Sequence, residues 1–219
     1  MSDHANLYQR LIEAARDTLD ATGRLPASLD ELAARTGADP AAVAGCFAST
    51  AALREGVIWH ATTLLNDALR RGVIESGGQS PDAQLRALVH SYAEWADRNP
   101  ALFRLIAHGL SGPLETDSTL YRFGLSMRDL FARKLNQMRE LGMIRDDCRI
   151  ESLLLLVHCT VAGANMLFAG RDTDPWLRDD PRPSPMLAAE IFDTLLRTLG
   201  VPGSATGPAP GSRTARAEP

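Results

Sequence analysis

The sequence is poor in aromatic residues and in lysine. Aromatic residues make up 5% of its 219 positions, while leucine and alanine dominate a hydrophobic content of 45%. This balance favours packed helices over sheets, because few windows show the alternating β-branched and aromatic residues of strands. Lys134 is the only lysine, and a formal net charge of −4 argues against a protein that coats nucleic acid or an anionic membrane.

Features of secreted and membrane proteins are also missing. The three cysteines have no short paired spacing, so neither a disulfide framework nor a zinc site is predicted. The N-terminus, MSDHANLYQR, is polar and has no apolar signal core. No stretch approaches about eighteen uninterrupted apolar residues, so we expect no membrane span. We therefore expect a cytoplasmic protein.

Catalytic and metal-binding patterns are missing as well. None of the five histidines has the i, i+4 spacing of paired helical metal ligands, so no metal is expected. The segment GLSG (109–112) has part of a nucleophile-elbow pattern, but Pro113 takes the fifth position and no strand precedes it. No phosphate loop or dinucleotide fingerprint occurs, and we expect no cofactor. We predict that the protein is not an enzyme.

Residues 28–53, SLDELAARTGADPAAVAGCFASTAAL, predict two short helices around a tight turn and the start of a third helix. Ser28 forms a capping box with the glutamate three positions on, and Gly37 suits the turn that ends the first helix. Asp39 can cap the second helix, with Pro40 in its first position, where the missing N–H costs little. This is the plan of a helix-turn-helix, whose second helix usually enters the major groove of DNA.

The first 55 or so residues resemble the DNA-binding domain of the TetR family of bacterial regulators. LIEAARDTLDATG (11–23) is similar to the family's first helix, and the match continues through SLDELAARTGA (28–38). Phe47 and Leu53 fall where that family ends its recognition helix and opens a long fourth helix. The resemblance implies an all-α fold, with an N-terminal three-helix helix-turn-helix domain and a six-helix regulatory and dimerisation domain.

The candidate recognition helix has few side chains that can read bases. The family commonly carries a lysine, small or hydroxyl residues, an aromatic residue and histidines there, whereas this chain has PAAVAGC (40–46). Alanine can touch a thymine methyl group but cannot make the bidentate hydrogen bonds that discriminate bases. Residues 1–55 hold eight acidic residues and five arginines, a formal charge of −3 where a basic patch is expected. The residues expected to contact DNA, through helix-start N–H groups as well as side chains, are Ser28, Asp39, Pro40, Ala41, Ala42, Ala44, Gly45 and Thr50.

Six further helices are expected, separated by breaks rich in glycine, serine and proline. Their expected ranges are 49–71, 81–98, a short helix from 100, 116–141, 150–169 and 185–199. The segment after them is a low-complexity tail that cannot bury a core and is expected to be disordered. The expected domains are 1–48 for DNA binding, 49–200 for ligand binding and dimerisation, and 201–219 for the disordered tail.

The segment SLLLLVHCTVAGANMLFA (152–169) is apolar on more than one face, and a helix that is apolar all round must be buried. In the TetR family the last two helices pair with those of a second subunit, which implies a homodimer here. The alternative is a core helix within one subunit.

The resemblance also implies a small apolar effector, bound between helices of the second domain beside a few polar groups. Asn165 lies in an apolar helix and needs a hydrogen bond if it is buried. Aromatic and methionine residues on helix faces are more often core residues, so the sequence does not select among the candidates. The candidate pocket residues are Trp95, Phe103, His108, Tyr121, Phe123, Met127, His158, Asn165 and Phe168.

Two functions remain open from the sequence. The first is a ligand-responsive, DNA-binding transcriptional regulator, expected to be a repressor, that acts as a homodimer on a palindromic operator. The second is a TetR-like scaffold that has lost DNA binding and acts through protein–protein contacts, because an alanine-rich helix suits packing against a partner helix. The first requires four arginines to gather on the DNA side of the domain: Arg10, Arg24, Arg35 and Arg54.

Overall fold

The computed structural model describes residues 2–77, 80–145 and 147–198, and within these ranges it forms nine α-helices and no strand. The helices are α1 (Ser2–Thr22), α2 (Leu29–Thr36), α3 (Pro40–Cys46), α4 (Thr50–Glu75), α5 (Pro81–Arg98), α6 (Pro100–Leu110), α7 (Thr119–Glu140), α8 (Ile150–Ala169) and α9 (Ser184–Thr198). The predicted all-α fold class is confirmed. The predicted disordered tail, 201–219, lies outside the described residues.

α4 is longer than expected, because Gly72 does not end it. The helix continues past Arg71 to Glu75. A β-carbon on Gly72 would lie 2.8 Å from the β-carbon of Ser91 on α5, which is too close for two real atoms. The glycine therefore permits a close approach of α4 to α5, and the packing along α5 offsets its weak helix propensity.

α7 begins later than expected, at Thr119 rather than near Thr116. Ser118 is its N-cap, with a side-chain oxygen that accepts a hydrogen bond from the backbone N–H of Tyr121 at 3.2 Å. The start of this helix is therefore set by a serine cap, a signal that was present in the sequence.

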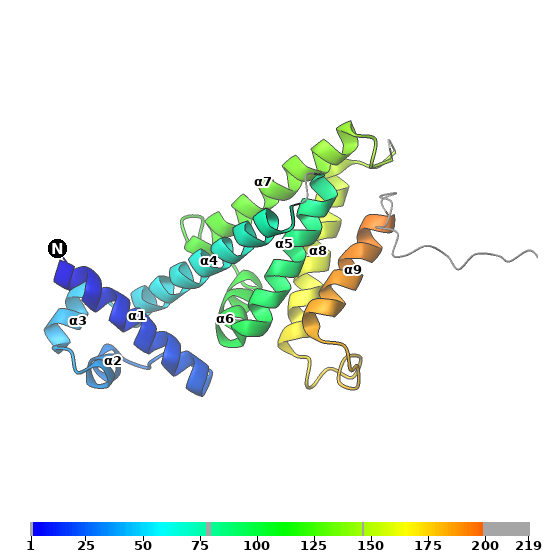
Figure 1. Cartoon of the computed structure of the whole chain (residues 1–219). Coiled ribbons are helices and arrows are strands. Elements are labelled where there is room, and N and C mark those ends of the chain that lie inside the picture. The colour runs from blue at the N-terminus through cyan, green and yellow to red at the C-terminus, as the bar shows by residue number, and fades with distance from the viewer. Residues whose placement is uncertain (1, 78–79, 146, 199–219) are drawn as a thin grey trace, which may run out of the picture.

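The helices form two parts that share α4 (Figure 1). α1, α2 and α3 lie together at one end, and α4 runs from them along the bundle formed by the later helices. Leu11, Leu32 and Val43, from α1, α2 and α3, are fully buried. α4 contributes Val57 to the same core and Leu65 further along, both fully buried. Because α4 is packed into both parts, a shift of α4 moves one relative to the other.

α9 packs along α5 in the bundle. Its Phe192 and Leu196 are buried, and an ion pair joins Asp193 to Arg86 of α5. The Arg86 guanidinium also lies 3.8 Å from the carboxylate of Asp82, one turn earlier on α5. These contacts fix α9 against α5, beside α8 (Figure 1).

Across the described ranges, no single helix is long and apolar enough to cross a membrane. α3 and α4 reach that length and composition only when taken together, and the pair is bent by 61° at its junction.

Candidate functional site

The α2–turn–α3 unit is built by local caps. The side-chain oxygen of Ser28 accepts a hydrogen bond from the backbone N–H of Glu31 at 3.1 Å. The Glu31 carboxylate in turn accepts one from the N–H of Ala27 at 2.9 Å, one residue before the cap. Gly37 ends α2 in the left-handed conformation with φ 64°, and Asp39 caps α3 by accepting from the N–H of Ala41. The two short helices predicted from the sequence are therefore present, with the predicted caps.

α3 presents a small and almost featureless surface. Val43 and Phe47 anchor it in the core, and Cys46 is half-buried. Seven of the eight residues predicted to contact DNA are exposed, and the eighth, Ala42, is half-buried. The exposed residues are Ser28, Asp39, Pro40, Ala41, Ala44, Gly45 and Thr50. A DNA backbone can approach α3 closely, but the exposed side chains of α3 itself, Pro40, Ala41 and Ala44, contain no hydrogen-bond donor.

Ser49 belongs to the same surface and was not among the predicted residues. It is exposed and caps α4, accepting a hydrogen bond from the backbone N–H of Ala52 at 3.1 Å. The sequence signal was a serine directly before an apolar helical run. With Ser28 and Asp39, it gives three capped helix starts, and helix N-termini are favourable positions for phosphate oxygens.

Two of the four arginines required by the DNA-binding interpretation are engaged within the domain. The guanidinium of Arg10 donates to the backbone carbonyl of Thr36, at the end of α2, at 3.1 Å. Arg35 pairs with the carboxylate of Glu31 at 3.2 Å. Arg10 and Arg35 are both exposed, but each already makes a contact within the domain that competes with a DNA phosphate.

The other two arginines do not complete a basic patch. Arg24 is exposed in the loop after α1. A β-carbon on Gly109 of α6 would lie only 3.7 Å from the guanidinium of Arg54, so Arg54 is directed towards the α4–α6 contact. The expected gathering of all four arginines on the DNA side is therefore not observed, because tertiary packing takes Arg54 to another helix.

His60 lies where α4 crosses α1, at the junction of the two parts. Its Nε2 atom is buried and has no hydrogen-bond partner in the described part of the chain. Burial lowers the pKa of His60, and the positive charge of Arg16 on α1 lowers it further, against an opposing effect of Glu13. Protonation of this imidazole is therefore disfavoured in the folded state.

We expect folding stability to fall when the pH is lowered below about 6.5, the ordinary histidine pKa, because His60 then takes up a proton in the unfolded chain before it does so in the folded one. His60→Gln, which is neutral throughout, should flatten this part of the pH dependence. Thermal melts of wild type and His60→Gln between about pH 7.5 and pH 5.5 measure the pH dependence of stability. The same loss of stability in both proteins would show that His60 does not cause the pH dependence.

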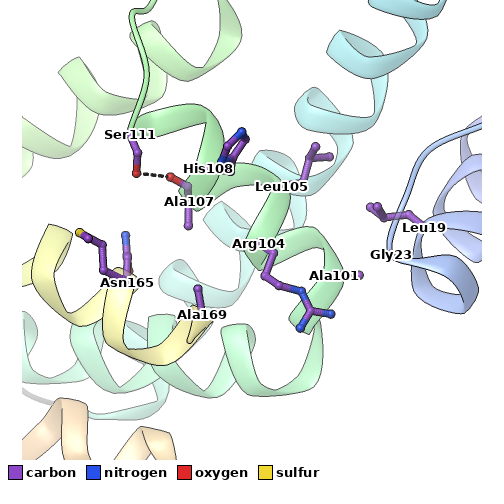
Figure 2. A pocket seen from close by; sticks show the side chains of 11 residues that line it. Leu19, Gly23, Ala101, Arg104, Leu105, Ala107, His108, Ser111, Asn165 and Ala169 are labelled. Carbon is purple, nitrogen blue, oxygen red and sulfur yellow. Dashed lines mark hydrogen bonds between the residues drawn. The ribbon is translucent and has the colours of Figure 1, made fainter. Parts of the chain in front are cut away.

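A cavity of about 540 Å³ lies between the end of α1, α6 and α8 (Figure 2). It is lined by Leu19, Gly23, Ala101, Arg104, Leu105, Ala107, His108, Ser111, Asn165, Met166 and Ala169. Most of this lining is apolar. Its volume falls in the range of small-molecule sites, roughly 300–1,000 Å³. Because the lining includes α1, the cavity touches the three-helix part as well as the bundle.

The structure brings together only two of the nine predicted pocket residues, His108 and Asn165, in this cavity. Trp95 lines a separate cavity of about 370 Å³ between α4 and α5. Phe103 and Phe123 are buried in the core. Met127 and Phe168 are half-buried and pack against that core. Tyr121 is half-buried on α7. Phe103, Phe123, Met127 and Phe168 therefore have the more frequent role of such residues, which is to form the core.

The structure does not place His158, another predicted pocket residue, at this cavity. It is exposed on α8, next to Val157, which is buried. Neighbouring residues on a helix point about 100° apart, so burial of Val157 turns His158 away from the bundle. The sequence could not show this, because α8 is apolar on several sides and gives no inward direction.

Asn165 is the most deeply buried polar group of the cavity, with 9% of its surface exposed. Its side-chain oxygen accepts a hydrogen bond from the hydroxyl of Tyr92 on α5 at 3.0 Å. Burial raises the pKa of Tyr92 to about 12, so this hydroxyl remains protonated as a donor. Because the Tyr92 hydroxyl donates to the Asn165 side-chain oxygen, the amide nitrogen of Asn165 faces the cavity.

Comparison with known proteins gives a consistent picture of the fold. No protein-family model and no curated protein matches the chain. A solved structure of a protein of unknown function from Rhodococcus sp. RHA1 is similar, with a TM-score of 0.72, 25% identity and coverage of 89% of this chain and 95% of that one.

Two solved regulators are also similar. A bacterial regulatory protein in the TetR family from Rhodococcus RHA1 has a TM-score of 0.61 at 17% identity, over 89% of this chain and 97% of that one. A transcriptional regulator of the TetR/AcrR family from Thermobifida fusca has a TM-score of 0.63 at 19% identity, over 87% and 97%. The similarity extends over nearly the whole length of both, well beyond the helix-turn-helix.

Proposed function

Because this chain has the fold of TetR-family regulators, we propose that it belongs to that family and acts as a homodimeric transcriptional regulator that binds DNA. We propose further that it is a repressor and that a small molecule releases it from a palindromic operator. The observation that carries this proposal is the exposed, fully capped α2–turn–α3 unit at one end of the molecule.

The small surface of α3 supports a particular way of binding. Ala41, Ala44 and Gly45 allow the DNA to come close enough for the helix-start N–H groups to reach phosphates. Alanine methyl groups can then contact thymine methyl groups in the major groove. With few free arginines, the dimer neutralises few phosphates. We therefore expect a shallower salt dependence than that of a protein with about six to ten phosphate contacts.

The exposed face of α8 supports the homodimer. Leu155 and Met166 are 66% and 72% exposed, and Cys159 and Ala162 lie between them on the same face. The intervals along the chain are four, three and four residues, the spacing of a helix-packing seam. An exposed apolar face of this kind marks an interaction surface, and a two-fold dimer also supplies the two recognition helices that a palindromic operator requires.

α4 supplies a route from effector to DNA. It is buried among α1–α3 near its start and among the bundle helices beyond. A shift of α4 on effector binding changes the separation of the two recognition helices from the roughly 34–36 Å of one DNA turn. A coupling free energy of about 1–3 kcal/mol, a 5- to 150-fold change in affinity, is sufficient.

A second function is favoured by the charges at the same surface. Residues 1–55 carry a formal charge of −3; Arg35 pairs with Glu31 on α2, and Arg54 is directed towards α6. A dimer with this surface could bind a protein partner through α3 instead of DNA, with the partner's helix packing on the exposed alanines.

Titration of the purified protein with DNA from its own gene neighbourhood, at several salt concentrations, tests the proposal. A regulator gives selective binding over unrelated DNA, and the logarithm of its affinity falls linearly with the logarithm of salt concentration. A folded dimer without selective binding even at low salt would reject the proposal and favour the protein-partner function.

A further inference from the structure

The cavity between α1, α6 and α8 has the chemistry of a binding site for an elongated apolar molecule that carries a carboxylate. We propose that it binds such an amphipathic anion. The binding itself is independent of the function proposed above. Its role as an effector rests on that function.

The walls provide the apolar part of the site. Leu19 of α1 and Leu105 of α6 line the cavity, and small residues such as Ala169 of α8 leave room between the helices (Figure 2). A cavity of about 540 Å³ accommodates an alkyl chain and its head group. Burial of an alkyl chain here is favourable by roughly 25 cal/mol for each Å² of apolar surface removed from water.

Asn165 provides an unfilled hydrogen-bond donor. Its oxygen is committed to the Tyr92 hydroxyl at 3.0 Å, whereas no acceptor in the described part of the chain pairs with its amide nitrogen. Figure 2 shows this nitrogen pointing towards α6, across the cavity from Ala107. A charged acceptor makes the strongest hydrogen bond with such a donor. A carboxylate oxygen meets this need.

Arg104 provides a positive charge at the cavity, which favours a ligand of negative charge. It is exposed at the cavity on the side of Ala101 (Figure 2), and it has no ion pair or hydrogen bond with any residue that the structure describes. His108 follows one turn later on α6, and the lining contains no aspartate or glutamate. The lining therefore holds a cationic side chain and no acidic one among mostly apolar walls, which favours an anion over a cation.

The position of the cavity gives the ligand access to α1. Leu19 and Gly23 form the α1 side of the lining, and Leu19 is also part of the core. A ligand that bridges Arg104 to this helix end contacts both parts of the molecule. It changes their relative position only if it binds one arrangement better than the other.

Calorimetric titration of the full chain with decanoate, without DNA, tests the binding. We expect decanoate to bind and decan-1-ol, which has the same chain without the charge, to bind more weakly by about tenfold or more. Arg104→Gln should weaken decanoate binding about tenfold and leave decan-1-ol unaffected. Arg122→Gln, a change at an exposed arginine of α7 outside the cavity, should affect neither.

Asn165→Asp keeps an oxygen acceptor for the Tyr92 hydroxyl, and it replaces the N–H donor by a carboxylate oxygen that repels an anion. It should also weaken decanoate binding, at an unchanged far-UV circular dichroism spectrum. Equal affinities for decanoate and decan-1-ol, or full decanoate affinity in Arg104→Gln, would overturn the proposal.

The failure of this proposal is distinguishable from the failure of the proposed function. Decanoate binding without any DNA binding keeps the cavity site and rejects the regulator. Selective DNA binding without decanoate binding does the opposite. Where both occur, release of DNA by decanoate in wild type but not in Arg104→Gln would identify the site as the effector site.

Discussion

An aspartate in place of Ala44 is expected to abolish selective DNA binding, with at least about a 100-fold loss of affinity. Ala44 is exposed on α3, so the new carboxylate meets phosphates or base edges where a methyl group had allowed close approach. Like-charge contacts across an interface cost several kcal/mol. The subunit fold should be retained, because Ala44 is not part of the core. Gel-shift or anisotropy titrations of the purified variant measure the loss.

Ala21→Asp is the matched control for this change. Ala21 is also an exposed helical alanine of the three-helix part, so the substitution adds the same charge at the same cost in helix propensity. We expect it to reduce DNA affinity only slightly. Equal losses in both variants would mean that net charge, and not the α3 surface, controls binding. Unchanged binding in Ala44→Asp would mean that α3 is not the reading helix.

An aspartate in place of Leu155 is expected to convert the dimer into monomers. In the proposed interface this side chain packs against the partner's α8, and each copy of the variant would bury an unpaired carboxylate there. A charge that is buried without a partner costs about 3–5 kcal/mol. The dimer dissociation constant should therefore rise by roughly 100-fold or more. Sedimentation velocity over a concentration series measures it. Operator binding should fall with it, since one subunit carries a single recognition helix.

Leu125→Asp provides the control for the dimer prediction. Leu125 is 44% exposed on a different helix, α7, and its replacement has the same chemistry. It should leave the dimer intact. If Leu155→Asp remains a dimer at low micromolar concentration, the subunits associate through a different surface, and the apolar face of α8 needs another explanation.

The two variants separate the parts of the proposed mechanism. Ala44→Asp should be a dimer that does not bind DNA, whereas Leu155→Asp should be a monomer with an unaltered recognition helix. A disulfide or other cross-link that restores the dimer in the Leu155→Asp background should restore DNA binding as well. No such treatment should rescue Ala44→Asp.

The sequence by itself determined the helices and most of their boundaries, because caps depend on neighbours within one turn. The end of α4 is an exception, since the helix packs along α5 beyond its expected end at Arg71. Ser28, Gly37 and Asp39 act on N–H and C=O groups a few residues away, so their roles could be read without knowledge of the rest of the molecule. The same holds for the all-α class and for the TetR-like order of helices, which set the fold. The one late start, at α7, followed a serine cap that the same reasoning can find.

Only the tertiary structure decided which faces of those helices are buried and which charges are free. α8 is apolar nearly all round, so its sequence could not show that Asn165 points inward and His158 outward. Arg54 was a candidate for phosphate binding until packing placed it against α6. The cavity itself combines residues from α1, α6 and α8 that are far apart in the chain. Such sites depend on long-range packing, which no local pattern of residues encodes.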